Sequence, residues 1–276
     1  MADADSTQLS LPPLFWELHA GLGQQAPGSN EATLHALDFT VEHVLTVKPN
    51  LQALTCLVIG CGPGREVLVI ANHPAFAERG GSKIIATDTS EVLLNELRHR
   101  ITRAQLPASL VEVRNVSMTM LCNEFHAQEF SILWSEGSAY VIGIEKALQE
   151  WKPLLTVDAG VLALTECCWL VEDKKEVPSE CFDFWEKEYP GMKTIKEVKL
   201  LAGDMGYKLL RYFTLDKECW ENYYQPIRFR LQKLKEKYKN DDSALQTIHT
   251  EEHEVNIYDK YSTYYGYVFF LLQRIA

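Results

Sequence analysis

Residues 55–66 read TCLVIGCGPGRE, and this stretch decides the fold. A short apolar run is followed at once by glycines at positions 60, 62 and 64. Glycines at this density favour a tight turn or a close approach of the backbone to another group, because glycine has no β-carbon and accepts left-handed backbone angles. Residues 65–72 then show helical spacing of apolar residues. The segment is therefore predicted to be a buried strand, a glycine turn and a helix.

Predicted strands and helices alternate on both sides of this segment. Further helices are expected at 31–47, around 90–97, at 145–155 and over most of 216–250. Further strands are expected at 83–88, 110–115, 131–135, 160–166, 206–215 and 264–274. Alternating strands and helices with nearly unbroken apolar strands are typical of an α/β fold whose parallel sheet is covered on both faces.

The chain is expected to form one domain with two additions. Residues 1–30 are rich in glycine and proline, contain Phe15 and Trp16, and are interpreted as a lid over the site. Residues 31–276 are expected to form the main domain, with a helical insertion at about 216–255.

Composition narrows the possible partners. The chain has 276 residues and a formal net charge of −11, which disfavours a nucleic-acid substrate because a phosphate backbone attracts clustered Lys and Arg. The longest apolar run, residues 267–272, is too short to cross a membrane, so no membrane partner is expected. There is no basic and apolar leader, and the seven cysteines form no C-x-x-C pair, which indicates a reduced, cytoplasmic protein. Composition leaves the oligomeric state open.

The glycine turn is predicted to bind a cofactor that contains a ribose. Asp88 ends the next predicted strand, 24 residues after Gly64, where a carboxylate can accept hydrogen bonds from both ribose hydroxyls. Dinucleotide-binding proteins favour G-x-G-x-x-G, with the pyrophosphate on the helix N-terminus. Here Arg65 stands where that pattern needs its last glycine.

The pattern G-x-G-x-G, from Gly60 to Gly64, resembles the first motif of the class I S-adenosylmethionine-dependent methyltransferases. The stretches WSEGSAY, FWEKEYPGM and YDKYSTYYGYVFF look like one mostly uncharacterised, largely bacterial subfamily that methylates small molecules. The resemblance implies a Rossmann-like sheet of seven strands, mostly parallel, with an antiparallel last strand. It also implies S-adenosyl-L-methionine as cofactor, with cofactor contacts at Gly60, Cys61, Gly62, Gly64, Asp88, Thr89, Ser117, Met118 and Ser135.

Two positions depart from the family pattern. Val58 stands two residues before the first glycine, where most members have an acid, and Gln24 replaces an arginine of the subfamily. Both positions relate to the methionine end of the cofactor, so they put cofactor affinity in question but leave the fold unaffected.

The expected activity is methyl transfer to an N or O atom of a small-molecule metabolite. The alternatives are a non-catalytic protein that binds S-adenosylmethionine and an NAD-dependent oxidoreductase. The resemblance places Glu136, after the fourth strand, and Glu166, at the end of the fifth, beside the reacting methyl group. Either carboxylate could receive a proton from the acceptor.

Aromatic residues and one histidine are the expected contacts of the acceptor. They are His19, Tyr140, Trp169, Tyr261 and Tyr265. Along the last strand, alternation places Tyr265 and Tyr267 on one face. His249 and His253 have helical spacing, but Thr250 stands where the zinc-protease pattern needs Glu, so no metal is expected.

Overall fold

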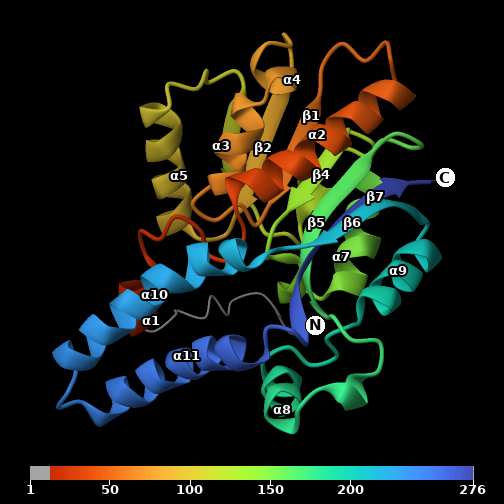
Figure 1. The fold of residues 1–276 in the computed structure, drawn as a ribbon. Coiled ribbons are helices and arrows are strands. Elements are labelled where there is room, and N and C mark those ends of the chain that lie inside the picture. The colour runs from red at the N-terminus through yellow and green to blue at the C-terminus, as the bar shows by residue number, and fades with distance from the viewer. Residues whose placement is uncertain (1–12, 276) are drawn as a thin grey trace, which may run out of the picture.

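The computed structural model describes residues 13–275, and its centre is a seven-stranded sheet with the order β3-β2-β1-β4-β5-β7-β6 (Figure 1). The strands are β1 (Thr55–Ile59), β2 (Lys83–Asp88), β3 (Val111–Asn115), β4 (Ile132–Ser135), β5 (Val161–Trp169), β6 (Tyr207–Thr214) and β7 (Tyr265–Arg274). The first five pair in parallel, and β7 runs antiparallel to β5 and β6. The predicted fold class is confirmed.

Strand β5 continues three residues beyond its predicted end. Every residue of β5 is buried, and its last three residues, 167–169, pair with residues 265–267 of β7. The prediction stopped at Glu166 because a charged residue normally marks the end of a buried strand. Glu166 lies two residues past the end of β4, which stops at Ser135 opposite Leu164.

Helices cover both faces of the sheet. One face packs against α2 (Asn30–Val47), α3 (Arg65–Asn72), α4 (Pro74–Ala77) and α5 (Glu91–Arg103). The other packs against α6 (Leu121–Glu124), α7 (Ile144–Trp151) and α9 (Ile195–Asp204). Ser29 caps α2 by accepting a hydrogen bond from the backbone N–H of Ala32. Short 3₁₀ turns η1 (Ala139–Val141), η2 (Lys152–Leu154) and η3 (Lys174–Glu176) complete the connections.

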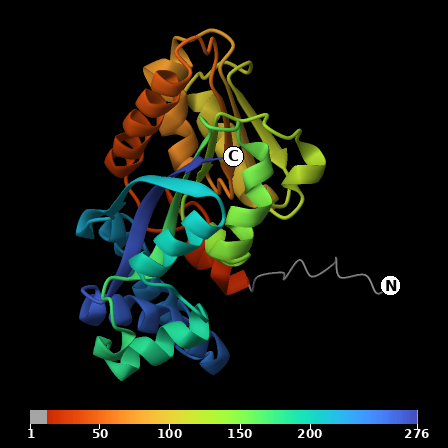
Figure 2. The ribbon, with the colours of Figure 1, turned by 90° about the vertical axis from the view of Figure 1, so that its right-hand side faces the viewer.

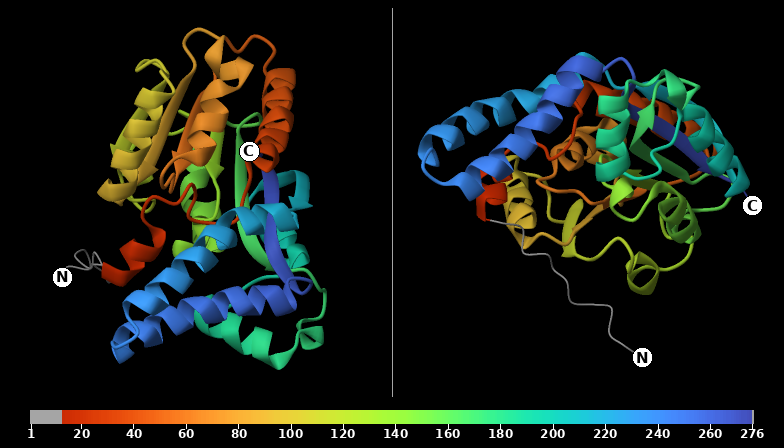
Figure 3. Two further views of the ribbon diagram at one scale, coloured as in Figure 1. Left: turned by 60° about the vertical axis from the view of Figure 1, so that its left-hand side comes forward. Right: turned by 90° about the horizontal axis from the view of Figure 1, so that it is seen from below.

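A helical section covers the carboxyl ends of the strands. It consists of α1 (Pro13–His19), α8 (Ser179–Glu188), α10 (Lys217–Lys237) and α11 (Asp242–Tyr261). Figures 2 and 3 show α10 and α11 side by side beyond the end of the sheet, with α1 against α10. Their shared core includes Trp220, Tyr224, Ile257 and Tyr265. Helix α11 continues to Tyr261, six residues beyond the expected end of the helical insertion at about 255, and the turn into β7 begins there.

Among residues 13–275 there is no helix with the length and apolar character that a membrane span requires.

Candidate functional site

The glycine turn follows β1 and leads into α3, as predicted. Gly60, Gly62 and Gly64 all have positive φ, at 66°, 49° and 80°. A β-carbon on Gly64 would lie 2.2 Å from Cδ1 of Leu97, and one on Gly60 would lie 2.5 Å from the Ser138 side chain. The nearest atom to a β-carbon on Gly62 is 3.8 Å away. Gly60 and Gly64 are therefore needed for packing, whereas a β-carbon on Gly62 would make only ordinary van der Waals contact with Cγ of Gln25.

Asp88 joins the end of β2 to this turn. One carboxylate oxygen accepts the N–H of Gly62 at 2.8 Å, and the other accepts the N–H of Ser90 at 2.8 Å. These two bonds fix the carboxylate beside the glycine turn and use one lone pair of each oxygen, so both oxygens can accept another donor. Thr89 follows and is exposed. The structure thus brings together the predicted turn and the predicted acid.

The loop after β3 also reaches the turn. The terminal methyl of Met118 lies 3.6 Å from the position of a β-carbon on Gly60. The Met118 carbonyl accepts a hydrogen bond from Nε1 of Trp151 at 3.1 Å, which holds the loop on α7. Ser117 contacts Thr119 through its hydroxyl at 3.0 Å. Ser117 and Met118 therefore lie in the same region as the other predicted cofactor contacts.

At two of the predicted cofactor contacts, the side chain is buried among other groups of the protein. The Ser135 hydroxyl is fully buried and bonds to the Ser138 hydroxyl at 2.7 Å, while Ser138 donates to the carbonyl of Ile59. Cys61 is 3% exposed, and burial raises the pKa of its thiol well above the usual range. Both side chains tie the turn together, so any cofactor contact at these positions comes from the backbone.

Glu136 is the centre of a buried polar network. Its carboxylate pairs with the Arg65 guanidinium and accepts the Thr33 hydroxyl at 2.7 Å and Nε1 of Trp134 at 2.8 Å. Only 5% of the Glu136 side chain is exposed. The network joins β4, α2 and α3. The geometry therefore gives Glu136 a structural ion pair with Arg65, which favours a structural role over the predicted role as base.

Glu166 has a different environment. It is 2% exposed and accepts a hydrogen bond from the Tyr189 hydroxyl, from the segment after α8. Burial raises its pKa to about 7, against the hydrogen bond from Tyr189 and the charge of Lys193. A carboxylate with a pKa close to neutrality can both accept and release a proton under ordinary conditions.

Another carboxylate with a raised pKa is Glu254 of α11, which is half-buried. It accepts the Tyr224 hydroxyl at 2.9 Å. Tyr140 of η1 is 47% exposed, and its ring meets that of Tyr189 edge to face at 6.0 Å. Tyr140 therefore lies beside the tyrosine that donates a hydrogen bond to Glu166.

The other predicted acceptor contacts separate into two groups. Trp169 and Tyr265 are fully buried and meet at a centroid distance of 6.5 Å. Tyr265 and Tyr267 both contact Trp220, so they share a face as predicted. The Tyr261 hydroxyl donates to Glu180 at the protein surface, and this removes it from the site.

The segment between α1 and α2 lies across the turns. His19 is 5% exposed, and its Nε2 lies 3.6 Å from a carboxylate oxygen of Glu251 on α11. A β-carbon on Gly137 would lie 2.3 Å from the methyl of Ala26. Gln24 donates to the carbonyls of Ala26 and Gly28, so it stabilises its own loop. Residues 1–12 of the expected lid lie outside the described residues.

The segment is fastened to the helical section and to α5. Arg230 of α10 donates to the carbonyls of Leu18 at 2.7 Å and Ala20 at 2.6 Å. Arg100 of α5 donates to the carbonyls of Leu22 and Gly23. Motion of the segment would break these bonds.

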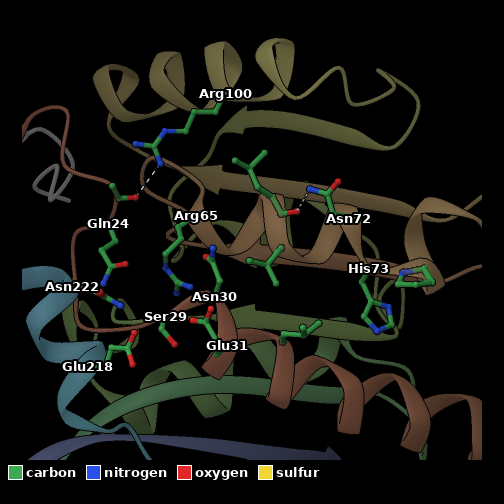
Figure 4. Close-up of a pocket in the computed structure, with 15 residues that line it drawn as sticks. Gln24, Ser29, Asn30, Glu31, Arg65, Asn72, His73, Arg100, Glu218 and Asn222 are labelled. Atoms are coloured by element: carbon green, nitrogen blue, oxygen red, sulfur yellow. Dashed lines mark hydrogen bonds between the residues drawn. The ribbon is translucent and has the colours of Figure 1, made fainter.

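A hollow of about 900 Å³ lies elsewhere, on the side of the sheet covered by α2 and α3. Figure 4 shows Gln24 and Asn222 at one end of this hollow and His73 at the other. Arg65 borders it, but none of the predicted cofactor contacts does. The predicted cofactor contacts therefore favour the carboxyl ends of the strands over this hollow as the functional site.

Sequence reasoning missed Tyr189, Tyr224 and Glu254. All three belong to the helical section, where the pattern of apolar residues predicts helices but not their direction. One feature of the sequence could have drawn attention to Glu254 in the stretch HTEEHEV. It directly precedes Val255, which is buried in the helix. That signal does not show which element the side chain meets.

Comparison with known proteins agrees with this geometry. Residues 57–163 match the family model described as a methyltransferase domain. No curated protein matches the chain. Two similar solved structures are S-adenosylmethionine-dependent methyltransferases in complex with S-adenosylhomocysteine, from Geobacter sulfurreducens and Thiobacillus denitrificans. They are 15% and 14% identical to this chain with TM-scores of 0.72 and 0.74, and each alignment covers 96% of this chain and 98% or 99% of the other.

The fold also occurs with another activity. The [4+2]-cyclase SpnF is 15% identical, with a TM-score of 0.67, and the alignment covers 96% of this chain and 92% of SpnF. The glycine turn, the acid at the end of β2 and the match of residues 57–163 nevertheless agree with one another. Residues 57–163 therefore match a methyltransferase domain, and the chain shares the fold of these solved structures.

Proposed function

We propose that the protein transfers a methyl group from S-adenosylmethionine to an N or O atom of a small-molecule metabolite. The observation that carries this proposal is the bond between Asp88 and the N–H of Gly62, which fixes a carboxylate beside a turn whose three glycines all have positive φ. The carboxylate would accept the ribose hydroxyls, and the glycine turn would let the methionine chain approach the backbone. The loop with Ser117 and Met118 would border the adenine.

The chain's own residues would act on the acceptor. A lone pair of the acceptor attacks the methyl carbon, and the carbon–sulfur bonding pair returns to sulfur, which loses its positive charge. The methylated atom then loses its extra proton to a base. Glu166 is the proposed base, because it is buried and its pKa is close to neutrality. Alignment of acceptor and methyl group supplies most of the acceleration.

Glu136 keeps a role through its neighbours. By pairing with Arg65 it fixes the turn after β4 against the start of α3, beside the glycine turn. Glu136 is therefore proposed as a positioning residue, in place of the predicted catalytic role.

The segment up to Gly28 is proposed to act as the lid. Its support is the contact of Ala26 with the turn at Gly137 and the anchoring of Leu18 and Ala20 by Arg230. Closure over the glycine turn would exclude water from the charged sulfur. Opening requires these hydrogen bonds to break.

The second candidate is a protein that binds S-adenosylmethionine without methyl transfer, or one that uses this fold for other chemistry. Val58 is fully buried and Gln24 bonds to its own loop, so neither side chain is free to meet the methionine end of the cofactor. The cyclase neighbour shows that this fold also carries chemistry other than methyl transfer. The geometry offers no support for NAD, because Arg65, in the position of the last dinucleotide glycine, is committed to Glu136.

Calorimetry with S-adenosylmethionine and S-adenosylhomocysteine tests the cofactor. Asp88→Ala should weaken binding by about 1.5–3 kcal/mol, the usual cost of an unmatched charged partner. Glu91→Ala, an exposed acid three residues later, is the matched control and should bind as the wild type does. Equal affinity in both variants would remove the assignment. A metabolite screen that detects released S-adenosylhomocysteine then separates a methyltransferase from a protein that only binds the cofactor.

A further inference from the structure

The hollow beside α2 and α3 contains none of the predicted cofactor contacts, yet it is large enough for a metabolite. Its volume of about 900 Å³ lies within the range of small-molecule sites. Arg65, Leu68, Val69 and Asn72 line it along one side of α3. The helical rise from Arg65 to Asn72 amounts to about 10 Å. The hollow therefore extends along about two turns of α3 and can accommodate an extended ligand.

One wall of the hollow is the segment before α2, and hydrogen bonds fix this wall in place. Arg100 donates to the carbonyl of Gly23 at 3.0 Å, and Asn222 donates to the carbonyl of Gly28 at 3.3 Å. Nε2 of Gln24 donates to two carbonyls of the same segment. These three side chains therefore direct their donors at the protein's own backbone.

Each Arg or His side chain that lines the hollow already has a carboxylate partner. The pairs are Arg65 with Glu136, Arg100 with Glu96, and His73 with Asp38. Because positive charge at these positions is compensated within the protein, it offers little attraction to an anionic ligand.

Two carboxylates that line the hollow have no such partner. Among residues 13–275, neither Glu31 of α2 nor Glu218 of α10 takes part in an ion pair. The amide nitrogens of Gln24, Asn72 and Asn222 donate to backbone carbonyls, which leaves their oxygens to accept. Figure 4 shows Glu31 and Glu218 at the end of the hollow that also contains Gln24 and Asn222. The free polar groups at this end are therefore mainly acceptors, and two of them are charged.

The middle of the hollow is apolar. Leu68 and Val69 lie between Arg65 and Asn72 on α3 and are half-buried, and Leu34 of α2 is 42% exposed. Contact with the methylene groups of a ligand would remove this apolar surface from water. The lining thus combines an apolar stretch with acceptors and negative charge.

We propose that this hollow is a binding site for a linear aliphatic polyamine. Its ammonium groups would lie against Glu31, Glu218 and the amide oxygens, and its methylene groups against Leu34, Leu68 and Val69. An ammonium group supplies only hydrogen-bond donors, which matches a lining whose free groups are mainly acceptors. A dicarboxylate of the same length would instead meet two unpaired carboxylates. The inference does not depend on the proposed methyl transfer.

Calorimetry on the full chain tests the ligand class, at physiological ionic strength so that long-range attraction is screened. Spermidine is the probe. Its neutral control, 1,8-octanediol, has the same chain length without charge, and octanedioate carries a negative charge at both ends. Spermidine should bind to one site at least tenfold more tightly than the diol, and octanedioate should not bind.

A double variant assigns the binding to the two acids of the hollow. Glu31→Gln combined with Glu218→Gln should weaken spermidine binding at least fivefold. Both acids lie in the first turns of helices, so the matched control is Glu145→Gln combined with Asp242→Asn, which removes two exposed acids from the first turns of α7 and α11. The control changes the net charge equally and should keep spermidine affinity within about twofold of the wild type.

A second pair of variants leaves the acids intact. Leu34→Lys adds an ammonium group to the apolar wall, where it competes with the ligand and should weaken spermidine binding at least fivefold. Leu200→Lys adds the same charge at a position of α9 that is 61% exposed and outside the hollow, so it should have little effect. Melting curves show whether each variant is folded, and the two lysine variants decide the outcome if the double variant does not fold.

Three results would overturn the proposal. The first is equal affinity for spermidine and the diol. The second is equal weakening by the two double variants, because spermidine would then respond only to the net charge of −11. The third is wild-type spermidine affinity in Leu34→Lys, which would place the bound amine outside the hollow.

Discussion

The ion pair between Arg65 and Glu136 gives the sharpest test of how this site is built. Glu136→Gln keeps the shape of the side chain and removes its charge. The Thr33 and Trp134 donors can still bond to an amide oxygen, but the Arg65 guanidinium loses its anion. The pKa of Arg65 shows what that anion does: burial would lower it, and the charge of Glu136 raises it above its ordinary value.

The magnitude follows from burial. The side chains of Arg65 and Glu136 are 12% and 5% exposed, so solvent cannot replace the missing partner. Removal of one member of a buried pair typically costs about 3–5 kcal/mol. In a domain of this size each kcal/mol lowers the melting temperature by roughly 2–4 °C. The variant should therefore melt about 6–20 °C below the wild type.

Thermal and urea unfolding, each followed by circular dichroism, measure this effect. Arg65→Met in the Glu136→Gln background should recover much of the loss, because no buried charge then remains unpaired. Glu236→Gln is the control for losing an exposed pair, since Glu236 and Lys239 are 78% and 61% exposed. That control should change stability by about 0–1 kcal/mol.

Binding and turnover decide between the structural and catalytic roles. Per folded molecule, Glu136→Gln should bind S-adenosylhomocysteine with nearly wild-type affinity and keep most of its turnover with the acceptor that the metabolite screen identifies. A variant with wild-type stability and turnover reduced about 10²-fold would refute the reasoning and restore Glu136 as the base.

Three further predictions address other parts of the site. Gly64→Ala should destabilise the protein in urea by more than the same change at Gly62, because only the former β-carbon meets Leu97, at 2.2 Å; equal losses would contradict this packing argument. Burial raises the pKa of Glu166 in the folded protein to about 7, above its unfolded value of 4.5. Between these two pH values the folded protein binds a proton that the unfolded chain has released. The stability of the wild type should therefore fall, relative to Glu166→Gln, as the pH rises from 4.5 to 7. Parallel stability curves for these two proteins would show that the carboxyl is not desolvated. Arg230→Ala removes the hydrogen bonds to the carbonyls of Leu18 and Ala20, so proteinase K should cleave residues 18–28 faster, with protection restored in part by S-adenosylhomocysteine; cleavage at the wild-type rate would exclude Arg230 as an anchor.

The sequence alone was sufficient to predict the strand, the turn and the helix around Gly62. Apolar continuity predicts a buried strand, closely spaced glycines predict left-handed backbone, and helical spacing predicts α3, all within 18 residues of local pattern. The same local reasoning predicted Asp88 at the end of β2. Parallel pairing of β1 and β2 then brings the two together, because the carboxyl ends of neighbouring parallel strands lie at one edge.

Local sequence patterns also led to two wrong predictions. The end of β5 was predicted three residues early, since Glu166 is charged and the pairing partner of the extension lies about a hundred residues later in β7. Tyr261 was grouped with the site because it belongs to a tyrosine-rich stretch. It lies instead at the end of α11 and bonds to Glu180 at the surface.

What the sequence determined by itself was the order of elements, the turn and the acid that accompanies it, because these depend on backbone angles and apolar periodicity within short stretches. Only the tertiary structure decided which carboxylate is free. Glu136 meets Arg65, 71 residues away, and becomes half of a buried ion pair. Glu254 meets Tyr224 only because α10 and α11 pack together beyond the sheet. The physical reason is that the state of a buried charge depends on its neighbours in space, and apolar spacing along the chain does not identify those neighbours.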